Sequence, residues 1–261
     1  MQHIRAIGQE GTPAALDVAG VSHFYGRKQA LKSVSFSIRP ATFTVLLGLN
    51  GAGKTTLFSL TNHLFDTRHG EIRIFGHDIN RDSSEALRRM GVVFQARTLD
   101  LDLSVRQNLS YHACLHGIGA RDAARRIAAV LETVEMSDRL DDKARSLSGG
   151  QMRRIEIARA LLPSPPLMLL DEATVGLDIR SRAGILSTIR SLVERRGIAV
   201  LWATHLIDEV EDGDEAVVLR QGNLVAKGSV RDVVQSTGKS SIRAAFSELS
   251  GIGQPSATEA S

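Results

Sequence analysis

The chain has 261 residues, of which 43% are hydrophobic and 23% are charged, as in an ordinary globular protein. This length suits one large α/β domain with an insertion, or two small domains. The net charge of +3 is small and dispersed, so the composition does not indicate nucleic-acid binding. The single cysteine, Cys114, excludes an intrachain disulfide and fits a reducing compartment.

Neither a membrane span nor a secretory signal is expected. No segment reaches the roughly 18 consecutive apolar residues of a spanning helix. Arg5, Gln9 and Glu10 interrupt the apolar residues of the N-terminus, which therefore lacks the core of a signal peptide. We expect a soluble, intracellular chain. Residues 1–14 and 237–261 are rich in small and polar residues and are predicted to be loose ends.

The first part of the chain has strand character. Short alternating runs at residues 16–18 and 34–38 predict two antiparallel strands. The apolar run at residues 43–47 stops at a glycine and is followed by leucines at helical spacing, which predicts strand, loop and helix. Further strands are predicted at 72–75 and 92–94. The leucines of the predicted helix are Leu57, Leu60 and Leu64.

The character changes to helix between residues 97 and 166, and strand signals then resume at 167–170, 199–203 and 216–219. In the helical part, apolar residues recur at i, i+3, i+4 and i+7, which forms one apolar stripe. A helical insertion within an α/β sheet is the simplest interpretation. The residues of the stripe are Ile127, Val130, Leu131 and Val134.

A phosphate-binding loop follows the predicted strand at 43–47. The sequence Gly48-x4-Gly53-Lys54-Thr55 matches this pattern in full. Glycines let backbone N–H groups turn toward phosphate, while Lys54 would reach the β- and γ-phosphates and the Thr55 hydroxyl would bind Mg²⁺. The alternative, a glycine-rich turn, is disfavoured by the strand before it and the helix after it. The predicted nucleotide-binding residues of the loop are Gly48, Asn50, Gly51, Ala52, Gly53, Lys54, Thr55 and Thr56.

Two carboxylates, Asp171 and Glu172, close the apolar run at 167–170. Such runs suit a parallel strand that is buried on both faces, and ligands bind at the carboxyl ends of these strands. Asp171 would then hold Mg²⁺, and Glu172 would polarise the attacking water. Acids at a strand end are usually only solvated, but a phosphate-binding loop in the same chain favours the functional interpretation.

The string Leu147-Ser148-Gly149-Gly150-Gln151 precedes another helical stretch. By itself it reads as plain helix capping, with Ser148 as the N-cap and the glycines for the bend. A helix N-terminus with a hydroxyl and bare glycine amides is also a good receptor for a γ-phosphate. Taken without the other motifs, the string favours the capping role.

The phosphate-binding loop, LSGGQ and Asp171-Glu172, in this order, resemble the ATP-binding cassette (ABC) ATPases over about residues 16–234. The resemblance implies one α/β domain over 15–236. This is a P-loop NTPase fold with an antiparallel β subdomain and a RecA-like parallel sheet (15–96 and 167–236). A helical subdomain is inserted at 97–166. The resemblance also implies that Ser148, Gly149, Gly150 and Gln151 contact ATP held by a partner's phosphate-binding loop.

Further family elements fall in order along the chain. Gln95 matches the glutamine that senses Mg²⁺ and couples to the membrane subunit, Asp178 a residue of the dimer interface, and His205 the histidine that contacts the γ-phosphate. Singly, such residues are usually just satisfied polar groups. Tyr25 fits the aromatic that stacks on adenine, although Phe24 takes that place if the register slips, and either residue could belong to the core.

The implied protein is an ATP-hydrolysing subunit that uses ATP and Mg²⁺ and works as a head-to-tail dimer. It would energise a separate membrane permease from the cytoplasmic face of the cell membrane, with no nucleic acid as partner. The catalytic residues implied are Lys54, Glu172 and His205, and the metal-binding residues are Thr55, Gln95 and Asp171.

Two other functions compete with this one. A soluble ABC ATPase that acts on ribosomes or DNA usually has two cassettes, or long coiled-coil or zinc insertions, and this chain shows neither. A non-hydrolysing nucleotide sensor is disfavoured because Glu172 and His205 are both present. Residues 174–178 resemble the drug- and nodulation-type exporter branch, and residues 104–112 resemble subunits associated with quinoprotein (PQQ) alcohol oxidation systems.

Overall fold

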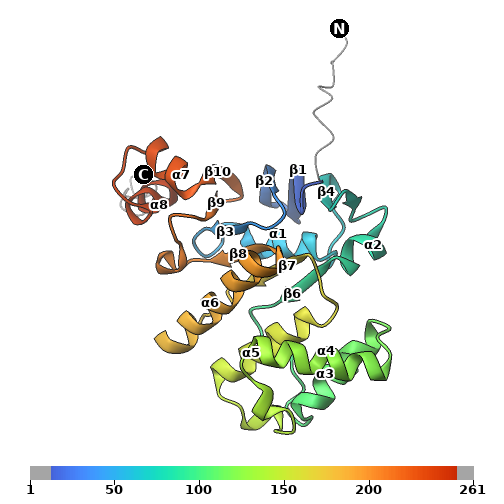
Figure 1. Ribbon diagram of the computed structural model, residues 1–261. Helices are drawn as coiled ribbons and strands as arrows, with labels where there is room; N and C mark the ends of the chain where they lie inside the picture. Colours follow the sequence, from blue (N-terminus) through green and yellow to red (C-terminus); the bar gives the residue numbers. More distant parts are fainter. Residues whose placement is uncertain (1–12, 252–261) are drawn as a thin grey trace.

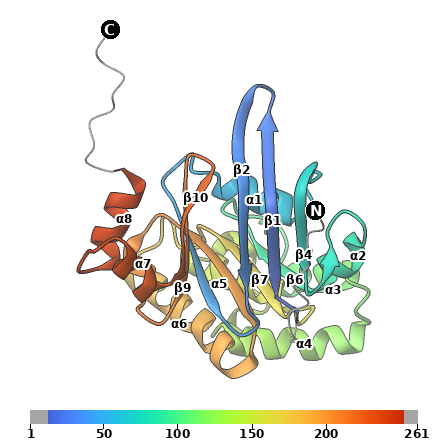
Figure 2. The same cartoon turned by 90° about the horizontal axis from the view of Figure 1, so that it is seen from above.

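The computed structural model describes residues 13–251, and two β-sheets form its centre (Figure 1). The first sheet is antiparallel and has the order β2-β1-β4-β5. Both antiparallel strands predicted from the alternating runs are confirmed, and they are longer than those runs. Figure 2 shows that the β1–β2 hairpin projects from the body of the molecule. The strands are β1 (Leu16–Tyr25), β2 (Lys28–Ile38), β4 (His69–Ile74) and β5 (His77–Asp78).

The second sheet has six strands in the order β10-β9-β3-β8-β7-β6. Only β10 runs antiparallel to its neighbour, and the other pairs are parallel. Every residue of β3, β7 and β8 is buried, as expected for continuous apolar runs in a parallel sheet. The strands are β3 (Phe43–Leu47), β6 (Met90–Val93), β7 (Leu167–Asp171), β8 (Ala199–Thr204), β9 (Glu215–Arg220) and β10 (Asn223–Ser229).

The two faces of this sheet belong to two hydrophobic cores. Side chains alternate between the faces of a strand, so Met168 and Leu169 of β7 lie in different clusters. Leu169 packs in the cluster that includes α1 (Lys54–Thr61) and the antiparallel sheet. Met168 packs in the cluster that includes the long helix α6 (Ile179–Arg196) and the helical segment between β6 and β7. Both faces of the sheet are therefore covered, and the carboxyl ends of its parallel strands remain for a site.

Helices α3 (Val105–Leu115), α4 (Ala120–Thr133) and α5 (Gly149–Leu161) lie together at the bottom of Figure 1, and α5 packs against β6. The predicted apolar stripe of α4 is buried as expected. Ser104 begins α3 with a capping box, since its hydroxyl accepts from the Gln107 amide. Within residues 13–251, no helix is both long and apolar enough to cross a bilayer.

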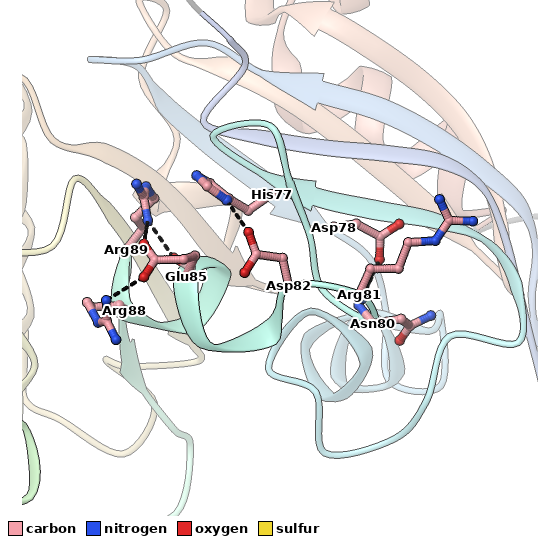
Figure 3. A network of polar contacts seen from close by, with 8 residues as sticks. All are labelled: His77, Asp78, Asn80, Arg81, Asp82, Glu85, Arg88 and Arg89. Carbon is pink, nitrogen blue, oxygen red and sulfur yellow. Dashed lines mark hydrogen bonds and ion pairs between the residues drawn. The ribbon is translucent and has the colours of Figure 1, made fainter.

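Figure 3 shows a set of local polar contacts in β5, the turn after it and the short helix α2 (Ser83–Arg88). His77 Nδ1 lies 2.6 Å from Asp82 Oδ2, and the Asp78 carboxylate accepts from the backbone amide of Asn80 at 2.8 Å. Glu85 Oε2 accepts from Arg89 Nη1 at 2.7 Å. The side chains of these pairs are partly exposed to solvent, so each pair adds little to stability. The contacts join residues close in sequence, so we interpret them as stabilising local structure and not as a functional site.

The prediction that 237–261 is a loose end is wrong for part of this segment. Helix α8 (Ile242–Ser250) follows α7 (Val230–Ser236), and the Phe246 side chain is buried in the core. Small and polar residues dominate the composition, but Ala245 and Phe246 supply a short apolar face that docks on the body. Residues 1–12 and 252–261, also predicted as loose, lie outside the described residues.

Leu64 does not belong to the helix that its spacing predicts. Helix α1 ends at Thr61, and His63 then adopts a left-handed backbone conformation with φ of 53°. Such a residue stops a helix, so Leu64 falls in the loop before β4, where its side chain is 59% exposed.

Candidate functional site

The phosphate-binding loop connects β3 to α1, and its glycines are required by close packing. A Cβ on Gly48 would lie 2.7 Å from the Ala52 Cβ. Gly53 has φ of 110°, and a Cβ there would lie 2.8 Å from Leu31 Cδ2. No side chain caps the N-terminus of α1, so the amides of the first turn are available to an anion.

Lys54, the first residue of α1, is buried at the base of the loop. Its Nζ donates to the Gly48 carbonyl at 2.7 Å and lies 3.4 Å from Glu172 Oε1. The ammonium group is thus held between the loop and the end of β7. Thr55 is exposed beside it, whereas Thr56 is buried.

Asp171 is the last residue of β7, and its carboxylate is 5% exposed. Burial and the adjacent Glu172 carboxylate raise the pKa of Asp171 to about 6, against the opposing effect of Lys54. Asp171 Oδ1 has no hydrogen-bond partner among the described residues. A buried acceptor without a donor is costly, so this oxygen suits a cation.

Glu172 is the meeting point of three separate motifs. Its carboxylate lies 3.1 Å from His205 Nδ1 and accepts from Gln95 Nε2 at 3.2 Å, in addition to the contact with Lys54. Its φ of 46° is rare for a residue with a side chain, and its amide donates to the Ala203 carbonyl at 2.9 Å. The structure therefore brings together groups that the sequence separates by up to 151 positions, from Lys54 to His205.

These groups line one cavity of about 790 Å³. Tyr25, at the end of β1, also lines it, whereas Phe24 lines a different cavity with His23 and Phe65. Because neighbouring residues of a strand point to opposite faces, only Tyr25 can meet a base in the cavity with the phosphate-binding loop. The predicted residues in its lining are Tyr25, Asn50, Gly51, Ala52, Gly53, Lys54, Thr55, Thr56, Gln95, Glu172 and His205.

Sequence reasoning missed several lining residues. One face of β2 contributes Lys28, Ala30 and Lys32 to the cavity. Their spacing of two residues is the signal in the sequence that places them on the same face of a strand. The two ammonium groups add positive charge to the cavity. The other missed lining residues are Gln29, Leu49, Val175 and Gln221.

The LSGGQ string at residues 147–151, called the signature string below, lies outside this cavity. Ser148 is the N-cap of α5, its hydroxyl accepting from the Gln151 amide at 3.3 Å, while Gln151 Oε1 accepts from the Ser148 amide at 2.8 Å. A Cβ on Gly150 would lie 2.5 Å from Ser181 Oγ, so glycine permits close packing of α5 on α6. Gly149 is similarly tight against Arg97. The capping role is thus real, and it leaves a phosphate-binding role open.

Asp178 lies beside the signature string rather than in the cavity. It caps α6, and its carboxylate accepts from the Ser181 amide at 3.0 Å and from the Ser181 hydroxyl at 2.7 Å. These hydrogen bonds lower the pKa of Asp178. None of residues 148–151 or Asp178 is among the described residues that line the 790 Å³ cavity.

Arg153 of α5 connects the signature helix to Gln95, a contact that the sequence did not indicate. Its guanidinium donates to the Phe94 carbonyl at 2.7 Å and to the Gln95 carbonyl at 2.8 Å. The buried partner Glu156 accepts from Arg153 at 2.7 Å. Burial of this pair within the chain fixes the backbone of Gln95 relative to α5.

Comparison with known proteins gives the family. The model of the ABC transporter family matches residues 31–175. Linearmycin resistance ATP-binding protein LnrL of Bacillus subtilis (strain 168) is 35% identical over 228 residues, which are 87% of this chain and 73% of that protein. Daunorubicin resistance ATP-binding protein DrrA3 of Streptomyces coeruleorubidus is 35% identical over 240 residues, which cover 92% and 76%.

Solved structures agree with the fold. The structure of an ATP-binding subunit of an ABC transporter superposes with a TM-score of 0.80 at 26% identity, and the match covers 90% of this chain and 99% of that one. CbiO1 of Clostridium perfringens, part of the ABC transporter complex cbiONQ, gives 0.77 at 28% identity, covering 85% and 91%. The chain therefore belongs to the ABC transporter family, as an ATP-binding subunit whose ATPase activity energises a transporter.

Proposed function

We propose that two copies of the chain bind two ATP molecules between them in a head-to-tail dimer. The observation that carries this proposal is the separation of two groups of residues. The cavity with Lys54 contains no described residue of 148–151, although α5 presents Ser148 and bare glycines at its N-terminus. A second copy, related by a two-fold axis, would place its residues 148–151 at this cavity. The first copy would place its own residues 148–151 at the cavity of the second.

Thr55 and Gln95, which line the cavity, together with Asp171, which precedes the lining residue Glu172, fit Mg²⁺ as a cofactor. Mg²⁺ prefers oxygen ligands, and the unpartnered Asp171 Oδ1, the exposed Thr55 hydroxyl and the Gln95 amide are of that kind. The ion would neutralise phosphate charge. Lys54 and the amides of the phosphate-binding loop would do the same from the protein side.

Glu172 is proposed to polarise the attacking water, with His205 as the group that senses the γ-phosphate. Glu172 now accepts from Gln95 and lies against His205 and Lys54, so all three side chains are within reach of the nucleotide's terminal phosphate region. Lys54 would leave Glu172 for phosphate oxygens, which frees the carboxylate to accept a hydrogen bond from water.

The membrane partner is proposed to dock at a second cavity of about 230 Å³ that adjoins Gln95. Phe94, the residue before Gln95, lines it together with Leu64 and His112. A permease segment bound there would touch Phe94, and the next residue along the chain, Gln95, contacts Glu172. The relatives named for linearmycin and daunorubicin resistance favour a transporter of the exporter type, with this chain on the cytoplasmic face, where ATP is available.

Mixing two inactive variants tests the shared sites directly. Lys54→Ala should destroy the phosphate-binding half of a site, and Ser148→Arg the signature half, so each purified variant should be inactive. A mixed dimer combines Lys54 of one chain with Ser148 of the other in one intact site. Random mixing at equal concentrations should restore about one quarter of wild-type ATP hydrolysis per chain.

The matched control mixes Lys54→Ala with Glu172→Gln, because both substitutions fall in the same half of the site. That mixture should stay inactive. Restoration in the control, or none in the test mixture although both variants bind to wild-type chains, would contradict the head-to-tail arrangement. ATP hydrolysis is followed by phosphate release, and mixed dimers by sedimentation.

A further inference from the structure

A fully buried carboxylate, Glu209, lies next to the nucleotide site but does not line it. It ends the short 3₁₀ turn at Ile207–Glu209, and its side chain is 0% exposed. Glu209 Oε2 accepts from the Trp202 indole Nε1 at 2.9 Å, and Oε1 accepts from the Thr174 hydroxyl. Carboxylates are almost never fully buried without a purpose-built set of partners, and this one has them.

The partners of Glu209 belong to two loops that carry the proposed catalytic groups. Thr174 is two residues after Glu172 and precedes Val175, which lines the nucleotide cavity. Glu209 itself is four residues after His205. The two loops follow the paired strands β7 and β8. Beyond the last backbone pairing of these strands, side-chain hydrogen bonds such as those of Glu209 can fix one loop relative to the other.

Two arginines extend the contact toward α6. Arg182 Nε, buried and without a hydrogen-bond partner among the described residues, lies 3.9 Å from Glu209 Oε1. Arg182 is in the first turns of α6, which Asp178 caps. Arg190, farther along α6, donates to the Glu209 carbonyl at 3.1 Å and binds Asp214. Glu209 therefore joins the His205 loop, the Glu172 loop and the helix that packs on the signature string.

We propose that Glu209 is a positioning residue for ATP hydrolysis. It fixes the loop of His205 relative to the loop of Glu172, and it transmits nucleotide-dependent movement of His205 to Thr174 and α6. This inference rests on the roles proposed above for Glu172 and His205. Because Glu209 does not line the cavity, it acts on the rate of the chemical step and not on nucleotide binding.

Steady-state kinetics separates positioning from binding. Glu209→Ala removes both hydrogen bonds, and kcat should fall about tenfold or more, as expected for a misplaced catalytic group, while KM for ATP changes less than about twofold. Glu209→Gln should recover most of kcat, since its carbonyl can accept from Trp202 and its amide can donate to Thr174. Thr174→Val, which keeps the side-chain shape, should lower kcat in the same direction.

Combined substitution tests whether Glu209 and Thr174 act through one contact. The double variant Glu209→Ala/Thr174→Val should lose no more activity than Glu209→Ala alone. Asn108→Ala is the structural control, because it removes hydrogen bonds of a buried side chain in the helical segment at 2.9 Å and 3.1 Å. It should lower thermal stability and leave kcat within about twofold of wild type.

Trp202 offers a spectroscopic reading, since it is the only tryptophan in the sequence and donates to Glu209. A non-hydrolysable ATP analogue with Mg²⁺ should shift the emission of wild-type chain, because His205 must leave Glu172 to reach a phosphate. Thr174→Val and Glu209→Ala should bind the analogue with a reduced shift.

The outcomes distinguish the two proposals. If wild type hydrolyses ATP, Glu172→Gln does not, and Thr174→Val and Glu209→Ala both keep wild-type kcat and emission shift, only the role of Glu209 is overturned. If Glu172→Gln hydrolyses ATP normally, the role of Glu172 is overturned first. Should Glu209→Ala fail to fold, Thr174→Val decides, because it buries no new polar group. An equal loss of kcat and rise of KM would also contradict positioning.

Discussion

At the scale of single residues, the carboxyl end of β7 is built at a cost to the ligand-free chain. Asp171 is buried, carries an unpartnered oxygen and has a raised pKa, while Glu172 beside it has a left-handed backbone. Nearby, Lys54 offsets part of the negative charge. Such an arrangement is expected where a cation and phosphates complete the site, because a purely structural strand end would avoid each feature.

Asp171→Asn should therefore stabilise the ligand-free chain. The pKa of Asp171 is raised from 3.8 to about 6, so its charged form destabilises the fold above that pH and its neutral form does not below about pH 4. At pH 8 the variant should gain about 2–3 kcal/mol in free energy of unfolding, a gain that disappears below about pH 4. Urea denaturation at both pH values measures it.

Two controls accompany this measurement. Asp178→Asn should act in the opposite direction at pH 8, since hydrogen bonds from Ser181 lower the pKa of Asp178. ATP with Mg²⁺ should raise the melting temperature of wild type more than that of Asp171→Asn. A stability difference that is the same at pH 8 and pH 4 would show that the charge of Asp171 is not its source.

At the scale of elements, α8 packs near the turn that follows His205, although the sequence predicts no helix there. Phe246 is buried in the core, Arg243 pairs with Asp208 of the turn at Ile207–Glu209, and Arg220 donates to the Leu249 carbonyl at 3.4 Å. The helix thus covers the turn that carries Glu209. Its main contribution is the apolar burial of Phe246, because the Arg243–Asp208 pair is exposed.

Phe246→Ala should lower the free energy of unfolding by about 3–4 kcal/mol, because a buried aromatic ring is lost and a cavity remains. Arg243→Ala is the matched control on the same helix. It should cost less than about 1 kcal/mol, as an exposed ion pair does. Urea denaturation compares the two, and equal small losses would mean that α8 is not docked in solution.

At the scale of the whole molecule, the two proposed half-sites are separate, and one groove, the cavity of about 230 Å³ beside Phe94, lies nearby. The phosphate-binding loop and the N-terminus of α5 belong to different parts of the fold, and Arg153 connects α5 to the backbone of Gln95. The groove beside Phe94 lies between these parts. A movement of the helical segment relative to the sheets would therefore alter both the half-sites and the groove.

Leu64→Asp should release the chain from membranes of cells that also produce its permease. The change puts a charge into an apolar groove whose other lining residues include Leu87 and Phe94, so a docked segment would lose its contact surface. Val225→Asp is the control, because β10 lies at the opposite edge of the sheet from β6 and its side chain is 37% exposed. Membrane fractionation measures the outcome, and equal retention of both variants would place the docking site elsewhere.

Much of the fold could be predicted because its signals are local. Apolar runs, alternation and helical spacing predicted every strand except β5 and β10, and the stripe of α4. The predictions for Leu64 and for residues 242–250 are wrong because the local signals there are weak. The left-handed His63 ends α1 without a glycine or proline, and α8 has only a short apolar face within a polar composition.

The sequence alone determined the family and the types of chemical group, because the motifs are contiguous and their glycines, lysine and carboxylates have few other uses together. Tertiary structure alone decided which groups meet. Tyr25 faces the cavity and Phe24 does not, Glu172 joins Lys54, Gln95 and His205, and Ser148 stays apart from them. Contacts between residues far apart in sequence depend on strand order and packing, which no local pattern of residues encodes.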